Sequence, residues 1–272
     1  MNTEEMLNVL LDALMTESKA SANIAIPEDS AGKWRLLQAL MNIRPPVPIR
    51  SELLELQDLV LTAQCRAKGV TYLEALQSIQ MEFPGTRIPF AERLFLWQGD
   101  ITTLVVDAIV NAANDRLLGC FIPHHRCIDN AIHSAAGIQL RLECNEIMRA
   151  QPHAEPTGQA QITRGYNLPA RYVLHTVGPI ITEQVTEEHM RMLASCYTSC
   201  LHLAAQYSDI RSVAFCCIST GEFRFPRNLA AEIAVQTVCD WMKGSDGRME
   251  KVVFNVFTQE DYGIYAGLFS AV

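Results

Sequence analysis

The sequence of 272 residues has few charged side chains, few aromatic ones and no long uninterrupted apolar segment. Charged residues make up 19% of the chain and aromatic residues 7%, whereas apolar residues make up 49%, enough for a substantial buried core. No apolar run approaches the roughly 18 residues that span a bilayer, and Glu4 and Glu5 stand where an export signal would be basic. We therefore expect neither membrane insertion nor export.

The chain also lacks an excess of basic residues. Its formal net charge is -8, from 22 Lys and Arg against 30 Asp and Glu. Binding along a nucleic-acid backbone needs clustered Lys and Arg to displace counterions, so we expect no nucleic-acid partner. A small anionic ligand stays open, because helix N-termini and backbone amides bind phosphate without a basic patch.

A disulfide framework is not indicated either. The nine cysteines are odd in number and irregularly spaced. Such a pattern in a long chain favours a reducing compartment, and the cytoplasm is the expected location. The chain shows no internal repeat and no low-complexity region.

The first part of the chain has helical periodicity. Apolar residues recur at three- and four-residue steps in residues 3–19 and again in residues 53–61. Between these segments "IRPPVPIR" (residues 43–50) must be extended, because consecutive prolines lack amide donors and restrict the preceding residue. A second punctuated stretch, "FPGTRIPF", ends at Phe90. We predict an N-terminal helical domain that ends there.

Short apolar runs follow and alternate with segments of helical period, so residues 91–272 are predicted to form a second, α/β domain. Several runs lack strict apolar and polar alternation, which is typical of strands covered on both faces. The runs are "LFLWQ", "DAIVNAA", "AQITRG", "YVLHTVG", "SVAFCCIS" and "KVVFNVF", and the predicted helices are residues 128–150, 187–207, 226–242 and 261–269.

Polar loops follow three of these runs, at the strand ends where open α/β sheets bind ligands. In "GDIT", Asp100 suits an exocyclic amine, although a helix or turn cap is an equal alternative. "NAAN" (residues 111–114) offers two amides to sugar hydroxyls, or is a plain Asn turn. "CISTGEFRFP" (residues 217–226) aims backbone N–H groups and a helix N-terminus at one point, which suits a diphosphate, or is an ST-rich turn.

Together these loops resemble the macrodomain family, the ADP-ribose-binding α/β fold, and within it the MacroD-type hydrolases. The matching segments "GDIT", "VDAIVNAAN", "LLG", "IDNAIHSAAG", "TGQAQITRGYNLPARYVLHTVGP" and "ISTGEFRFP" cover nearly all of residues 93–272 in order. The resemblance implies a three-layer α/β/α fold around a mixed sheet. It also implies that Asn114 binds the distal ribose and that Asp129 orients or activates water. The adenine would be held by Asp100 and Ile101, and the diphosphate and distal ribose by Ser219, Thr220, Gly221, Glu222 and Phe223.

The stretch "CFIPHHRC" departs from MacroD-type members, which have a short run of glycines before the aspartate and a glycine after it; this chain has Asn130 there. Cysteine and histidine are preferred ligands of Zn²⁺, and Cys-x4-His-x-Cys supplies three, leaving a fourth position for water or substrate. The alternatives are buried apolar thiols with exposed histidines, or a structural zinc that only pins the loop.

This stretch also resembles the zinc-containing macrodomain subgroup, which has a "GCF-x-P-x-H-x-C-I-D-N" signature and an added N-terminal helical domain. That resemblance selects Cys120, His125 and Cys127, and not His124, as ligands of one Zn²⁺ per chain. Alternation agrees, because residues 125 and 127 of an extended segment face the same way.

Other histidines and cysteines have simpler interpretations. His133, four residues after Asp129, either supports it by a hydrogen bond or faces the core. His175 is expected to be a satisfied sheet histidine, and Cys216 and Cys217 to be core residues of their strand.

The resemblance therefore implies a zinc-dependent hydrolase that removes mono-ADP-ribose from protein side chains. One implied partner is a lipoylated carrier related to the glycine-cleavage H protein, modified by a class M sirtuin. Two alternatives remain open: a reader that binds ADP-ribose without turnover, and a deacetylase of O-acetyl-ADP-ribose. The N-terminal domain would either recognise the protein substrate or pack against the catalytic domain.

Overall fold

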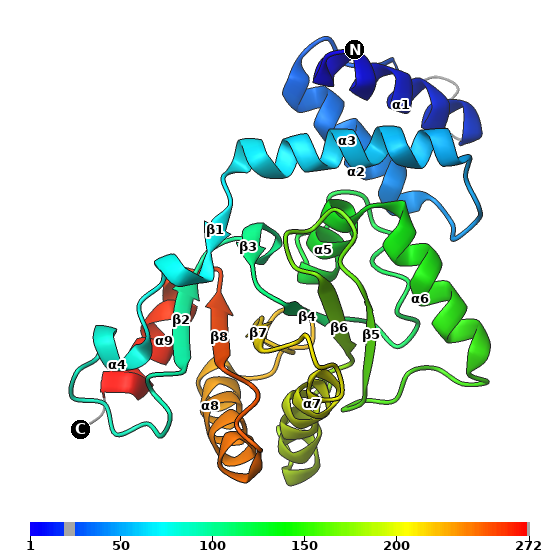
Figure 1. The fold of residues 1–272 in the computed structure, drawn as a ribbon. Coiled ribbons are helices and arrows are strands. Elements are labelled where there is room, and N and C mark those ends of the chain that lie inside the picture. The colour runs from blue at the N-terminus through cyan, green and yellow to red at the C-terminus, as the bar shows by residue number, and fades with distance from the viewer. Residues whose placement is uncertain (19–24, 271–272) are drawn as a thin grey trace.

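The computed structural model describes residues 1–18 and 25–270 and begins with three helices, drawn in blue and cyan in Figure 1. These are α1 (Thr3–Glu17), α2 (Ser30–Ile43) and α3 (Ser51–Lys68). Side-chain caps start the first two: Asn2 accepts the Glu5 amide and Asp29 accepts the Gly32 amide. Lys19, which ends the first predicted helical segment, lies outside the described residues.

The three helices bury a common apolar cluster, as their periodicity predicts. Residues 44–50 between α2 and α3 form neither helix nor strand, in agreement with their prolines. The cluster contains Leu7, Leu10, Leu11, Leu14, Leu37, Leu40, Met41, Leu56, Val60, Leu61 and, from a later helix, Ile138.

A short segment joins these helices to the rest of the chain. It contains β1 (Thr71–Tyr72), the 3-10 helix η2 (Leu73–Ala75) and α4 (Ile79–Glu82). β1 pairs in parallel with β3 (Leu104–Val105). The sequence analysis missed both strands, because two residues are too few to show a period.

A six-stranded mixed sheet forms the centre of residues 91–270. Each predicted apolar run contains one of its strands, which are β2 (Leu94–Gln98), β4 (Ala108–Ala112), β5 (Ala160–Arg164), β6 (Tyr172–Thr176), β7 (Ser212–Phe215) and β8 (Lys251–Val256). The order is β2-β8-β7-β4-β6-β5; β5 is antiparallel to β6 and every other pair is parallel.

Helices cover both sides of this sheet, as predicted. α5 (Ile128–Ala136) and α6 (Ile138–Ala150) pack together and contact β4 and β5. α7 (Glu187–Ala205) packs on α8 (Arg227–Gly244), which contacts α9 (Gln259–Ser270). In Figure 1, α5 lies above the central strands, α6 lies to the right of β5, and α7 and α8 lie below the strands.

The single helix predicted over residues 128–150 is wrong, because Gly137 divides it. Gly137 has φ +99, and a Cβ there would lie 2.6 Å from Nε2 of Gln57. The amide of Ile138 donates instead to Oε1 of Gln57, at 2.9 Å. The break therefore comes from packing against α3, which the local apolar pattern does not report.

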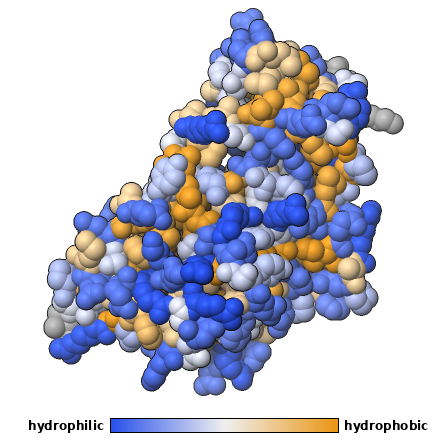
Figure 2. Space-filling view, viewed as in Figure 1, coloured by the Kyte–Doolittle hydropathy of each residue, from blue (hydrophilic) through white to orange (hydrophobic). Residues whose placement is uncertain are grey.

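The surface of this view is largely hydrophilic, and its apolar residues form separate patches, one of them over the N-terminal helices (Figure 2). Among the helices in residues 1–18 and 25–270, none combines the length and apolarity needed to cross a bilayer.

Candidate functional site

The predicted ligand loops meet at one edge of the sheet. β2, β8, β7 and β4 are consecutive parallel neighbours, so their carboxyl ends share that edge. The loops that leave β2, β4 and β7 contain residues 99–103, 113–127 and 216–223. The topology thus assembles the site from segments distant in sequence.

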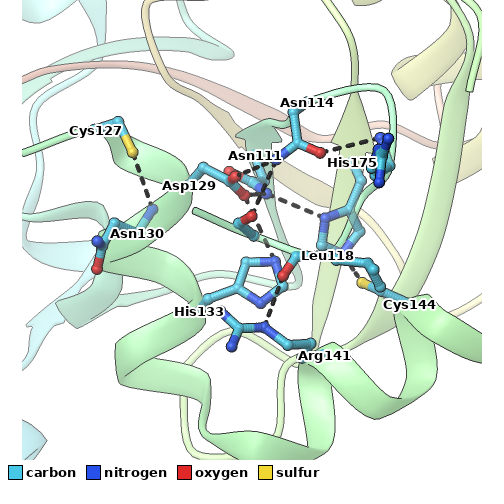
Figure 3. Close-up of polar contacts among 12 residues, drawn as sticks. Asn111, Asn114, Leu118, Cys127, Asp129, Asn130, His133, Arg141, Cys144 and His175 are labelled. Carbon is cyan, nitrogen blue, oxygen red and sulfur yellow. Dashed lines mark hydrogen bonds and ion pairs between the residues drawn. The ribbon is translucent and has the colours of Figure 1, made fainter. Parts of the chain in front are cut away.

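Asp129 and Asn114 lie together at the centre of this edge (Figure 3). α5 starts after the cap residue Cys127, which places Asp129 in its first turn, 5% exposed. The carboxylate accepts two bonds, one from Nδ2 of Asn111 at 2.8 Å and one from Nδ2 of Asn114 at 3.1 Å. Asn114 also donates to the carbonyl of Gly119 at 3.1 Å, so one amide ties the loop to the acid.

The environment of Asp129 tunes its acidity. Burial raises the pKa of Asp129 to about 6, against the lowering effects of the Asn111 bond, the Arg141 charge and the Asn114 bond. A carboxyl with a pKa in this range is mainly ionised at pH 7 and readily accepts a proton, as a general base must.

Two buried histidines lie behind Asp129. His175 is satisfied, as expected: Nδ1 lies 3.2 Å from Nδ2 of Asn111 and Nε2 lies 2.9 Å from Oγ1 of Thr163. Burial lowers the pKa of His175 to about 3, so its ring is neutral. His133 faces the core, and neither ring nitrogen has a hydrogen-bond partner among the described residues. Its Nε2 lies 3.5 Å from Asp129, but burial lowers the pKa of His133 well below its usual value, so the contact is not an ion pair.

The three predicted metal ligands lie together beside the N-terminus of α5, whose cap residue is Cys127. One ligand atom each of Cys120, His125 and Cys127 falls within 4.8 Å of the others, and all three residues are partly buried. Nδ1 of His125 is buried and has no hydrogen-bond partner in the part of the chain that the structure describes. His124 is exposed, as predicted, and has φ 59.

This arrangement fits Zn²⁺. Bonds of about 2.0–2.3 Å to nitrogen and sulfur place the ligands of a tetrahedral ion roughly 3.3–3.8 Å apart, so the loop needs only a small contraction. The orphaned imidazole nitrogen and two thiols also form a donor set that zinc prefers. On the outer side, Nε2 of His125 lies 3.4 Å from Oε1 of Glu222 and thus meets the predicted diphosphate loop.

The predicted adenine loop is held by its own residues and by α3. Asp100 caps the 3-10 helix η3 (Ile101–Thr103): its Oδ1 accepts the amide of Thr102 at 3.0 Å and the hydroxyl of the same residue at 2.6 Å. Its Oδ2 lies 3.2 Å from Nζ of Lys68 in α3. Partial burial raises the pKa of Asp100, but the Thr102 bonds and Lys68 outweigh it and lower the pKa overall. Ile101 is buried, and Asn255 of β8 donates to the carbonyl of Gly99 at 3.0 Å.

The predicted diphosphate loop contains local strain. Ser219 has φ 64, is buried, and its hydroxyl has no hydrogen-bond partner among the described residues. A Cβ on Gly178 would lie 2.0 Å from that hydroxyl, so glycine is required beside it. Thr220 donates to the carbonyl of Cys217 at 3.1 Å, and the carbonyl of Phe223 accepts the amide of Ile181 at 2.8 Å. Gly221 and Glu222 are exposed at the tip.

Comparison with known proteins agrees with this geometry. Residues 110–234 match the macro domain family. The chain is 48% identical to a protein-ADP-ribose hydrolase of Treponema medium, over 99% of this chain and 100% of that protein. It is 46% identical to a protein-ADP-ribose hydrolase of Staphylococcus aureus strain MSSA476, over 97% of this chain and 95% of that one. The chain belongs to the macro domain family.

Solved macrodomains share the fold. A Trypanosoma brucei macrodomain in complex with ADP-ribose has a TM-score of 0.64 and 30% identity, covering 84% of this chain and 94% of that one. An Oceanobacillus iheyensis macrodomain with ADP has a TM-score of 0.58 and 37% identity, covering 64% of this chain and 88% of that one. The predicted fold class is confirmed, and this macrodomain is an enzyme, a hydrolase.

Sequence reasoning missed some residues of this macrodomain's site. The sequence left Asn111 either facing sugar hydroxyls or in a plain turn, but it lies in β4, fully buried, and faces Asp129 and His175. Its place inside an apolar run was the available signal, because a buried amide needs internal partners. Asn42 and Arg141 contact residues 118–127, which we call the metal loop, although both are distant from it in sequence. No local sequence pattern marks either residue as part of the site.

Proposed function

We propose that this macrodomain hydrolyses the bond between ADP-ribose and a protein side chain. The observation that carries the proposal is the position of Asp129, a buried carboxylate bonded to Asn114 and two residues after the ligand Cys127 of the candidate metal loop. The names of its near-full-length relatives, protein-ADP-ribose hydrolases, agree with this activity.

Three loops would divide the ligand among them. We place the adenine against Asp100 and Ile101, and the diphosphate against Ser219–Phe223. In that loop the hydroxyl of Ser219 has no hydrogen-bond partner among the described residues, and Gly221 and Glu222 are exposed. Asn114 would fix the distal ribose while it holds Asp129. Positioning of this kind lowers the barrier because the reacting groups no longer have to find each other.

We propose that Cys120, His125 and Cys127 hold one Zn²⁺. A zinc ion held there would lower the pKa of a nearby water toward ~7 and could order the ribose hydroxyls; because the two thiolates would reduce its net charge, a role chiefly as a template for the sugar is also compatible with this donor set. Asp129 would orient the attacking water and take its proton, for which its raised pKa is suited. Closure of the Ser219–Phe223 loop over the ribose would exclude bulk solvent.

The first test pairs two measurements on the purified protein. Elemental analysis gives the zinc content, and release of free ADP-ribose from a mono-ADP-ribosylated protein is followed before and after chelation. We expect one zinc per chain and release that chelation stops. Replacing Cys127 by Ala should abolish release while weakening ADP-ribose binding only modestly; unchanged release would remove the metal from the mechanism. Bound ADP-ribose that is never released would instead indicate a reader.

We also propose a lipoylated carrier related to the glycine-cleavage H protein as substrate, from the resemblance to zinc-containing macrodomains alone. Faster release from the ADP-ribosylated carrier than from an unrelated modified protein would support it. The same assay with O-acetyl-ADP-ribose tests the deacetylase alternative. None of the nine cysteines, all of which the structure describes, is paired in a disulfide, and we propose a cytoplasmic location in agreement with this. The separate apolar cluster of α1–α3 supports our two-domain division into residues 1–90 and 91–272.

A further inference from the structure

The middle of the metal loop, residues 121–124, is exposed, and burial does not hold it in place. Phe121, Ile122 and His124 all have exposed side chains. His124 also has φ 59, a left-handed conformation that is unfavourable for a residue other than glycine. Such a loop keeps one conformation only where neighbouring groups fix it.

Asn42, near the end of α2, supplies part of this fixation. It is 1% exposed, and the hydrogen bonds of its side chain all go to residues of the metal loop and of α5. Oδ1 accepts the backbone amide of His124 at 3.4 Å and Nδ2 of Asn130 at 3.2 Å. Nδ2 donates to Oδ1 of Asn130 at 2.9 Å and to Oγ of Ser134 at 3.1 Å. Asn42 therefore holds the strained turn of the loop and the first turn of α5 at once.

Asn130 extends this hydrogen-bond network to the rest of the metal loop. Its Nδ2 also donates to the carbonyl of Ile122 at 3.0 Å, and its backbone amide donates to Sγ of Cys127 at 3.4 Å. A glycine at this position could make only the backbone contact. The asparagine thus connects α2 to both sides of His125.

Arg141 of α6 fixes the start of the metal loop to the C-terminal end of α2. One nitrogen, Nη1, donates to the carbonyls of Met41, Asn42 and Arg44 at 2.8, 2.9 and 2.6 Å. Nε donates to the carbonyl of Leu118 at 2.7 Å (Figure 3), and the guanidinium lies 4.3 Å from the ring centre of Phe121. A cation at these last carbonyls is also favoured by the helix dipole.

We propose that α2 positions the zinc ligands through Asn42, so that the N-terminal helices and the altered loop form one functional unit. The inference rests on the zinc site proposed above. Without Asn42, the turn at His124 loses its anchor and can relax to an unstrained conformation. His125 and Cys127, the next ligands along the chain, then separate, and zinc affinity falls.

The test compares Asn42→Ala with Gln57→Ala. Gln57 is a matched control, because it is also a fully buried amide at this junction, yet it bonds to Ile138 and Gln139 of α6 and not to the loop. Zinc affinity is measured by competition with a chromogenic chelator, and hydrogen exchange of residues 119–127 is measured in the metal-free protein. Thermal unfolding reports the general loss of stability in each variant.

We expect Asn42→Ala to weaken zinc binding about 10–100-fold, the usual effect of losing an outer contact to a metal site, and to accelerate exchange in the loop. Gln57→Ala should lower the unfolding temperature with zinc affinity and loop exchange unchanged. The double variant of Asn42→Ala with Asn130→Ala should lose less than the product of the single losses, because the two act through shared contacts. If the alanine variant does not fold, Asn42→Ser takes its place.

Equal zinc affinity and equal loop exchange in the Asn42 and Gln57 variants would overturn the inference. If the unmodified protein binds no zinc, the metal assignment itself fails. The exchange comparison then decides alone: faster loop exchange only in the Asn42 variant supports positioning by α2, and equal exchange refutes it.

Discussion

Replacing Ser219 by glycine should make the protein more stable and its ligand binding weaker. The wild-type residue holds φ 64, and relief of this conformation contributes roughly 1–2 kcal/mol. Removing a buried hydroxyl without a partner contributes about 1–3 kcal/mol more. The added freedom of glycine in the unfolded chain subtracts about 0.5–1 kcal/mol. The net expectation from these ranges is a stabilisation of about 1–4.5 kcal/mol.

A gain of this size should raise the unfolding temperature by about 2–4 °C per kcal/mol in a chain of this length. Ser219→Ala is the matched control, since it removes the hydroxyl but keeps the strain, and its gain should be smaller. Both variants should lose the proposed hydrogen bond to the charged diphosphate, worth about 1.5–3 kcal/mol, so the Kd for ADP-ribose should rise at least tenfold. Differential scanning calorimetry and titration calorimetry measure the two quantities.

Two results would refute this reasoning separately. A glycine variant that unfolds at or below the wild-type temperature would show that neither strain nor the orphaned hydroxyl destabilises the free protein. An unchanged Kd in both variants would show that the hydroxyl of Ser219 is not reserved for the ligand. The expected combination, higher stability with weaker binding, is typical of residues selected for function.

Three further changes test other parts of the site and fold. His125→Ala should remove the zinc and His124→Ala should retain it, because only the first is predicted to be a ligand; elemental analysis distinguishes them. Gly119→Ala places a Cβ 2.8 Å from the ring of His133 at φ +77, so we expect a lower unfolding temperature and at least tenfold slower turnover; wild-type values would contradict the packing. Partial burial raises the pKa of Asp107, but bonds from neighbouring donors outweigh it and lower the pKa overall, so the carboxylate stabilises the fold above pH ~4 and this contribution is lost as the pH falls. Urea unfolding of Asp107→Asn should therefore show a loss of about 1–3 kcal/mol at pH 7 that shrinks progressively as the pH falls below ~4.

Much of the fold follows from local pattern. All six strands of the main sheet lie within the apolar runs, and their burial on both faces explains why these runs show little alternation. The helix break at Gly137 was not predictable from its neighbours, because its cause is Gln57, far away in sequence. The strands β1 and β3 were not predicted, because two residues are too few to show the alternation of a strand.

The site, like the fold, contains some residues that could be predicted from the sequence and others that could not. The Cys- and His-rich composition of residues 120–127 suggested a metal site, whereas the roles of Asn114 and Asp129 and the choice of His125 came from the resemblance to macrodomains. Nothing in the local sequence connects these segments to Asn42, which meets them only after α2 has packed on α5. Long-range hydrogen bonds between single amides leave no periodic trace.

The pairing of β2 with β8 has a consequence for the order of events during synthesis. β2 is the edge strand, and the carbonyl of Gly99 beside it is fixed by Asn255, 156 positions later. Because a chain emerges from the ribosome with its N-terminal part first, the helices and most of the sheet can form while the adenine loop still lacks this anchor. The full binding edge exists only once β8 has been added. A ligand that requires the whole edge can therefore bind only after β8 has been added, and can stabilise only the completed sheet.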